Sequence, residues 1–164
     1  MTSLAPSPSS SPSSTKAAVT QFETRHIVTF EETNVVGNVY YANYFSWQGR
    51  CRELFLQRHA PELLAELEAG ELRMVTAHAS CDFLDEFRAF DEVLIRMQLL
   101  AFIPFGLSLG FEYSALGAAG QPGDVVARGR QDLKFLRRHG DSWQLAQLSR
   151  VSPSLASVLG AETP

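Results

Sequence analysis

The sequence lacks the long apolar run that a membrane-spanning helix requires, since no stretch of about 18 apolar residues occurs. We therefore expect no transmembrane helix. Charged residues make up 20% of the 164 positions, which is close to ordinary globular usage, and the formal net charge is only −4. This balance indicates neither nucleic acid nor an anionic membrane as a partner. Hydrophobic residues, at 45%, suffice for one compact domain.

Cysteine is sparse as well, because only Cys51 and Cys81 occur and neither lies in a CxxC or Cys/His cluster. We expect no disulfide framework and no zinc site, and we expect both thiols to be reduced and buried, as is typical of a cytoplasmic protein. The histidines show no pairing that would indicate a metal site or a Ser/His/Asp nucleophile. The sequence thus predicts neither a metal nor a cofactor. These histidines are His26, His59, His78 and His139.

The first fifteen residues, MTSLAPSPSSSPSST, are poor in large apolar side chains. Such a segment cannot offset the entropy of ordering, and it lacks the apolar stretch of a secretory signal. We predict a disordered tail over residues 1–19, a single domain over 20–150 and an irregular tail over 151–164.

Between the tails, the first half of the domain predicts two helices. Thr24–Phe30 is a strand candidate, and Glu31–Asn38 is a turn rich in Asn and Gly. From Val39 to about Gln57, aromatic and apolar side chains occupy several faces of a helix, which predicts a buried one. Pro61–Glu68 is a shorter helix, since it opens on proline and Gly70 follows it.

After Gly70 the apolar period changes to two, which predicts long strands joined by short connections. This order predicts an α+β fold in which an antiparallel sheet wraps around the long helix. A loop is expected at 116–124 and a short edge segment at 143–148. The expected strands are 72–84, 92–102, 105–113 and 125–136.

The run Phe30–Leu56 (FEETNVVGNVYYANYFSWQGRCRELFL) resembles the signature of the 4-hydroxybenzoyl-CoA thioesterase branch of hot-dog proteins. The match is specific from Gly37 to Arg52, and a looser pattern extends over about Arg25–Leu148. The resemblance implies the hot-dog fold and the hydrolysis of an acyl thioester.

One departure narrows the resemblance, because Asn34 stands where acyl-CoA thioesterases of this branch carry a catalytic Asp. The run Thr33–Tyr41 is similar to the thioesterases of enediyne polyketide biosynthesis. Those enzymes release a polyene β-ketoacyl chain from the acyl carrier protein domain of an iterative synthase, and the β-keto acid can then lose carbon dioxide. The resemblance also implies a homodimer or homotetramer with sites at the dimer interface.

Asn34 and Arg52 are the candidate catalytic residues. Asn34 can place a water molecule or hold the thioester, but it cannot serve as a carboxylate nucleophile. Arg52 lies in an apolar stripe, where an unpaired cation is costly, so it needs an anionic or carbonyl partner. Two alternatives stay open: Asn34 caps the turn, and Arg52 forms a structural ion pair with Glu31 or Glu32.

The amides that lead into the long helix are candidate oxyanion donors, since helix N-termini carry unpaired N–H groups and a positive dipole end. Tyr44, which the family motif places near the site, and Thr76 are further candidates for binding substrate. Both also fit ordinary core and strand positions. The candidate oxyanion and substrate-binding residues are Gly37, Asn38, Val39, Tyr40, Tyr41, Tyr44 and Thr76.

Apolar strand faces would form a tunnel for a long acyl chain, lined by Phe102, Phe105, Leu107 and Leu109. Two other functions remain open. A general acyl-CoA thioesterase would need a basic cluster for the 3′-phosphate of coenzyme A, which Lys134, Arg137 and Arg138 could supply. The missing Asp also fits a non-catalytic acyl-binding protein.

Overall fold

The structure is a computed structural model and describes residues 21–160, so the expected tail at 1–19 lies outside the described residues. The described residues form six strands and five helices, of which α1 is the longest helix. The strands are β1 (Gln21–Ile27), β2 (Leu72–Phe83), β3 (Glu92–Ile103), β4 (Gly106–Leu116), β5 (Pro122–His139) and β6 (Ser142–Leu145). The helices are η1 (Phe30–Glu32), α1 (Ala42–His59), α2 (Pro61–Glu68), α3 (Leu148–Val151) and α4 (Pro153–Val158).

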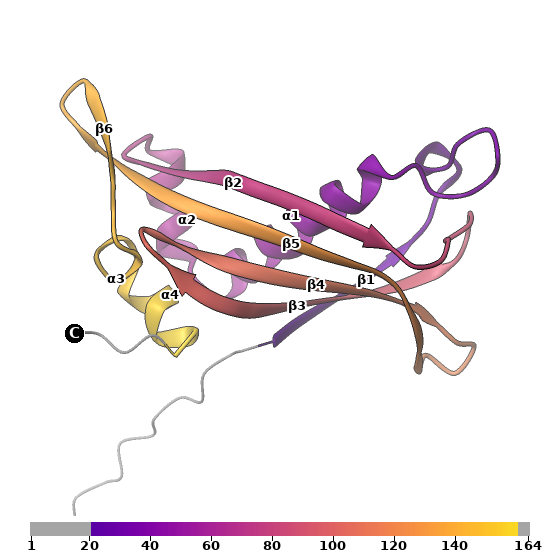
Figure 1. The fold of residues 1–164 in the computed structure, drawn as a ribbon. Helices are drawn as coiled ribbons and strands as arrows, with labels where there is room; N and C mark the ends of the chain where they lie inside the picture. The colour runs from indigo at the N-terminus through magenta and orange to yellow at the C-terminus, as the bar shows by residue number, and fades with distance from the viewer. Residues whose placement is uncertain (1–20, 161–164) are drawn as a thin grey trace, which may run out of the picture.

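The strands form one antiparallel sheet in the order β1-β3-β4-β5-β2, and β6 folds back onto the end of β5. Figure 1 shows the sheet curving in front of α1, which runs along one of its faces. The arrangement predicted from the sequence, an antiparallel sheet around one long helix, is confirmed. β2 lies at an edge of the sheet, where it pairs with β5 alone among the strands of residues 21–160.

Helix α1 packs through one face, whose side chains recur at intervals of three and four residues. The expected burial on several sides is wrong for the described chain, because the sheet covers one side only. Ser46, Arg50 and Glu53 on the other side are exposed. The buried face consists of Tyr44, Trp47, Gln48, Cys51, Phe55 and Leu56.

The helix also begins at Ala42 rather than at Val39. The backbone N–H of Val39 donates to the Phe87 carbonyl at 2.9 Å, and that of Tyr40 donates to the Glu32 carbonyl at 2.8 Å. These bonds tie the segment to its neighbours in extended geometry. Helix α1 can therefore begin only after Val39 and Tyr40.

The central strand β4 follows the predicted alternation, with Leu107, Leu109, Phe111 and Tyr113 all buried in the core. Phe105 departs from it. This residue lies in the turn before β4 with φ +61°, and its side chain is exposed. The expected loop at 116–124 is also shorter, since β4 extends to Leu116 and β5 begins at Pro122.

The prediction that residues 151–164 are irregular is wrong for the described part of this segment, which ends at residue 160. Residues 153–158 form α4, where the Ser152 hydroxyl accepts the N–H of Leu155 at 3.2 Å and Pro153 occupies the first turn. Leu155 is only 1% exposed. The short helices form because their apolar side chains close one end of the core, and capping satisfies the first free amide.

Both cysteines of the described chain are free thiols, with Cys51 buried and Cys81 half-buried. Among the helices of residues 21–160, none has both the length and the apolar character needed to traverse a bilayer.

Candidate functional site

A carboxylate fixes the turn that leads into α1. Glu32 accepts hydrogen bonds from Trp47 Nε1 at 2.7 Å and from the Thr29 N–H at 2.8 Å, and its carboxylate lies 2.8 Å from His26 Nε2. Burial raises the pKa of Glu32, but the bonds from Thr29, Trp47 and His26 outweigh it and hold this pKa below its usual value. The side chain is therefore ionised at neutral pH and joins β1, the turn and α1.

Asn34 stabilises this turn. Its Oδ1 accepts the N–H of Val36 at 2.9 Å, and its carbonyl accepts the N–H of Gly37 at 2.9 Å. Gly37 has φ +93°, a conformation that favours glycine. The alternative in which Asn34 caps the turn is therefore confirmed for its Oδ1 atom. The side chain is exposed, and its Nδ2 has no hydrogen-bond partner within residues 21–160, so this donor is available to a ligand.

The turn forms one wall of an open cavity of about 300 Å³, which we call the turn pocket. Six of the nine predicted site residues line it, whereas Gly37, Arg52 and Thr76 do not. Asn38 is partly buried there: its Nδ2 donates to Glu86 Oε1 at 2.6 Å, but its Oδ1 is buried without a partner. The lining consists of Asn34, Asn38, Val39, Tyr40, Tyr41, Tyr44, Phe83, Asp85 and Glu86.

The predicted row of oxyanion donors is largely occupied. Three of its five backbone N–H groups, those of Gly37, Val39 and Tyr40, donate to backbone carbonyls. The N–H groups of Asn38 and Tyr41 donate to no backbone acceptor among residues 21–160. Only these two amides of the row are free to bind an oxyanion.

Tyr44 combines a core position with a place in the pocket wall. Its ring is 2% exposed and packs on the rings of Trp47, Phe83 and Tyr113. The Tyr113 hydroxyl donates to the Tyr44 carbonyl at 2.9 Å and anchors the start of α1 to β4. Burial raises the pKa of Tyr44 to about 12. The phenol is therefore neutral at pH 7 and can only donate or accept a hydrogen bond.

Arg52 lies farther along α1, in a second cavity with room for about 10 Å³, which we call the arginine cavity. Its Nη1 donates to Gln131 Oε1 at 2.8 Å, and its Nε is buried without a partner. Glu53 approaches Nη2 only to 3.8 Å with an exposed side chain. Burial lowers the pKa of Arg52. The alternative ion pair of Arg52 with Glu31 or Glu32 is wrong, because within residues 21–160 Arg52 has Glu53 as its ion-pair partner and Glu32 pairs with His26.

The wall of the arginine cavity is almost wholly apolar. Leu107 and Leu109 of the predicted tunnel lie in it, but Phe102 and Phe105 line a separate open cavity of about 300 Å³ beside Leu148. The predicted tunnel is therefore not continuous, because the turn before β4 carries Phe105 away from the core. The remaining lining residues are Phe55, Leu56, Met74, Leu133, Phe135, Leu155 and Leu159.

Thr76 lies on the same side of the sheet as Arg52. It pairs with Leu133, and cross-strand partners project from the same face. Its side chain is nevertheless exposed, because β2 is an edge strand.

Ser108 was overlooked by the sequence analysis, although Gly106–Gly110 (GLSLG) has the spacing of a serine-hydrolase nucleophile elbow. That motif needs a sharp turn between a strand and a helix, whereas these residues belong to strand β4. The Ser108 hydroxyl is fully buried and donates to Asp132 Oδ1 at 2.7 Å. Ser108 therefore does not have the geometry of a nucleophile.

Comparison with known proteins gives consistent results. The model of the Thioesterase-like superfamily matches residues 28–159. The dynemicin thioesterase, whose crystal structures are described as revealing induced-fit and allosteric effects upon polyene binding, is 40% identical, with a TM-score of 0.76 over 85% of this chain and 95% of that one. No match was found among the curated proteins.

More distant structures share the fold. A 1,4-dihydroxy-2-naphthoyl-CoA thioesterase from Synechocystis is 18% identical, with a TM-score of 0.71 over 88% of this chain and 99% of that one. The 4-hydroxybenzoyl-CoA thioesterase from Pseudomonas sp. strain CBS-3 is 14% identical, with a TM-score of 0.67 over 79% and 94%. At this level of identity the likeness concerns the fold alone, and the α+β hot-dog arrangement predicted from the sequence is the one that they share.

Proposed function

The chain belongs to the thioesterase-like superfamily and is a thioester hydrolase, and we propose that it releases a long polyene β-ketoacyl chain from the acyl carrier protein domain of an iterative polyketide synthase. The likeness to the dynemicin thioesterase, at 40% identity over 85% of the chain, supports this substrate class. The released β-keto acid would then be able to lose carbon dioxide.

The main support for this proposal is the environment of Arg52. Its guanidinium is partly buried beside apolar side chains, and its closest partner, Gln131, is neutral. Since its nearest carboxylate, on the exposed Glu53, lies 3.8 Å from Nη2, the cation can still attract a ligand oxygen that is negative or becomes so, such as the β-keto oxygen or the carbonyl oxygen under attack. The apolar wall beside it would accept the hydrocarbon chain.

In this mechanism a water molecule attacks the thioester carbonyl carbon directly. The carbonyl oxygen gains negative charge, and Arg52 or the free amides of Asn38 and Tyr41 stabilise it. Asn34 would hold the water or the thioester through Nδ2. When the carbon–sulfur bond breaks, the thiolate leaves with the bonding electron pair and takes a proton from the attacking water.

Asn34 and Arg52 line different cavities of one chain, so a joint role calls for a second copy. The outer edge of β2 is unpaired within residues 21–160, and Val75–Ala79 is mostly exposed. Antiparallel pairing of two β2 strands about a two-fold axis would bring the Phe83 end of one strand towards the Met74 end of the other. Phe83 lines the turn pocket and Met74 the arginine cavity. We propose a homodimer, alone or within a tetramer, in which these two cavities meet.

Mixing two inactive variants tests this assembly. Asn34→Ala copies and Arg52→Ala copies, co-expressed and purified as a mixed dimer, would restore one intact site per heterodimer. A random mixture would then recover about a quarter of the parent turnover. If both residues act within one copy, the mixture stays as inactive as either variant.

The substrate is tested by incubating the purified protein with a β-ketoacyl–carrier protein and with the matched acyl-CoA, while thiol release and product mass are followed. We expect faster turnover of the carrier-bound chain. A preference for the CoA ester would favour the general acyl-CoA thioesterase, and saturable binding without thiol release would favour a non-catalytic acyl-binding protein.

The basic residues suggested as a binding site for the 3′-phosphate of coenzyme A do not support the general acyl-CoA thioesterase. Lys134 and Arg138 lie on one face of β5 and Arg137 on the other, since side chains alternate along a strand. Arg137 is also paired with Glu66 at 2.6 Å. The three side chains thus do not converge on one phosphate.

A further inference from the structure

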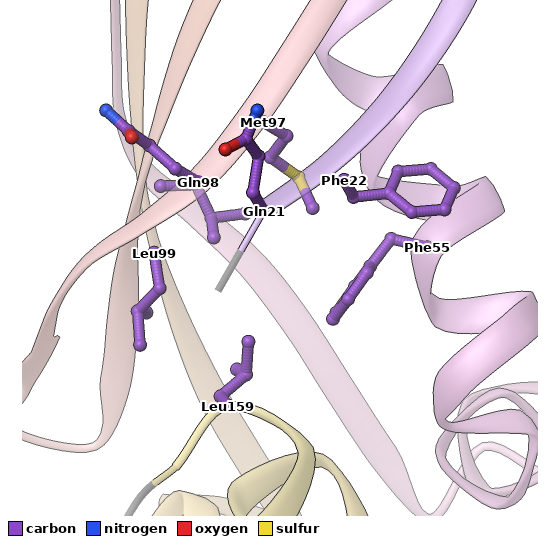
Figure 2. Close-up of a pocket in the computed structure, with 8 residues that line it drawn as sticks. Gln21, Phe22, Phe55, Met97, Gln98, Leu99 and Leu159 are labelled. Atoms are coloured by element: carbon purple, nitrogen blue, oxygen red, sulfur yellow. The ribbon is translucent and has the colours of Figure 1, made fainter. Parts of the chain in front are cut away.

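A small cavity lies next to the arginine cavity, on the side away from Arg52. Figure 2 shows it between β1, β3, α1 and the C-terminal segment, with Gln21 and Gln98 at one side and Leu159 opposite them. It has room for about 10 Å³, and we call it the outer cavity. Its other lining residues are Phe22, Phe55, Met97, Leu99 and Leu109.

The arginine cavity and the outer cavity share three lining residues, Phe55, Leu109 and Leu159. These side chains form the partition between two apolar spaces. Each space is about the size of one water molecule, so neither holds a chain without some movement of side chains. The two cavities adjoin at this partition, and together they extend from Arg52 at one end to Gln21 and Gln98 at the other.

The three residues of the partition differ in how firmly they are held. Leu109 belongs to the central strand β4, and Phe55 belongs to α1, where its ring packs edge-on against Phe22 at 5.6 Å between centroids. Leu159 instead caps the short helix α4, where its N–H donates to the Leu155 carbonyl at 3.0 Å and also to the Ser157 carbonyl, both within this C-terminal helix. Leu159 is thus the part of the partition that can move without disturbing the sheet or α1.

We propose that Leu159 is a specificity-determining residue, which sets the longest acyl chain that the enzyme accepts. The inference rests on the proposed function, because it takes Arg52 as the position of the thioester head. A chain that extends from there along Leu107 and Leu133 reaches Leu159 before it can enter the outer cavity. Chains that end before Leu159 fit with small adjustments, and longer ones must displace it.

The test compares the parent with Leu159→Ala and Leu159→Phe on a graded series of β-ketoacyl thioesters, from medium to long chains. We expect the optimum of kcat/KM to move to longer chains in Leu159→Ala. Each further methylene that finds room should improve binding about fourfold. Leu159→Phe enlarges the partition and should move the optimum to shorter chains. Because it leaves no void, it also serves if Leu159→Ala does not fold.

Leu148→Ala is the matched control. Leu148 belongs to the preceding short helix α3 and is 6% exposed, close to the 5% of Leu159, but it lines neither the arginine cavity nor the outer cavity. This variant should keep the parent's optimum chain length. The proposal is overturned if Leu148→Ala and Leu159→Ala shift the optimum alike, or if active variants at Leu159 keep it.

Binding is measured separately from turnover, by displacement of a fluorescent polyene fatty acid with acids of graded length. If the parent releases no thiol from any ester, the proposed function fails while the length dependence of binding still tests Leu159. A length profile of binding that is identical in the parent and both Leu159 variants overturns the inference, even where hydrolysis is intact.

Discussion

Arg52 of α1 donates a hydrogen bond to the side-chain amide of Gln131 on β5, with 2.8 Å between Nη1 and Oε1. The two residues are 79 positions apart in the chain. A neutral amide orients the guanidinium but does not neutralise it. The nearest carboxylate, on the exposed Glu53, lies 3.8 Å from Nη2, so the guanidinium is held ready for a ligand without a close ion pair.

Replacing Gln131 by Glu therefore gives the sharpest test of this relationship. The variant sets a carboxylate against Arg52 and should lower turnover by about tenfold or more, because the new ion pair competes with the substrate oxygen. The melting temperature should not fall, since the donor of Arg52 keeps an acceptor. Steady-state kinetics and thermal unfolding of the same preparation check both parts. Unchanged turnover would mean that the charge of Arg52 has no role.

Arg52→Ala should reduce turnover by about two orders of magnitude or more, the scale expected when an electrostatic contact with the transition state is lost. Arg52→Lys should also be poor, because an ammonium group lacks the planar set of donors that reaches Gln131 and a ligand together. The measurement is kcat beside the melting temperature. Normal turnover of Arg52→Ala with a lower melting temperature would assign the residue a structural role only.

Asn34→Asp separates the turn from the chemistry. The new carboxylate can still accept the N–H of Val36, so the fold and oligomer size should be unchanged. Turnover should fall, because a negative charge near the oxyanion site opposes the charge that develops on the carbonyl oxygen. An Asp variant faster than the parent would instead indicate a weakened acyl-CoA thioesterase.

Asn34→Ala is the companion variant. It loses the bond to the Val36 N–H as well as Nδ2, so it should cost about 1 kcal/mol of stability. The loss in turnover should exceed what this destabilisation explains. Chemical unfolding and single-turnover hydrolysis at one temperature give the two quantities.

Acid sensitivity should trace to Glu32. Its pKa lies below the ordinary value of 4.5, so its contribution is complete above about pH 4.5 and is lost as the pH falls through the lowered value. Glu32→Gln should cost about 1–2 kcal/mol at pH 7, because Trp47, Thr29 and His26 lose a charged acceptor. Unfolding curves of parent and variant should converge as the pH falls below 4.5. A constant difference down to pH 3 would contradict the role of the charge.

Local patterns determined much of the fold. The helix Pro61–Glu68 was predicted with its observed bounds, because Pro61 at the first turn and Gly70 after the end are signals contained within the segment. The strands followed in the same way from alternation of apolar side chains, as in Leu107–Tyr113. Ser152 and Pro153 carried a comparable signal for α4, which was overlooked because the helix has only six residues.

The sequence by itself thus determined the order of elements, the turn at Asn34 and Gly37, and a cation on an apolar helix. Tertiary structure alone decided which partner holds that cation, because Gln131 reaches Arg52 only after β5 has joined the sheet. It also placed Asn34 and Arg52 in different cavities and set Leu159 between two apolar spaces. Such relations depend on the distances between distant segments, which are fixed by packing across the whole core and not by any local period.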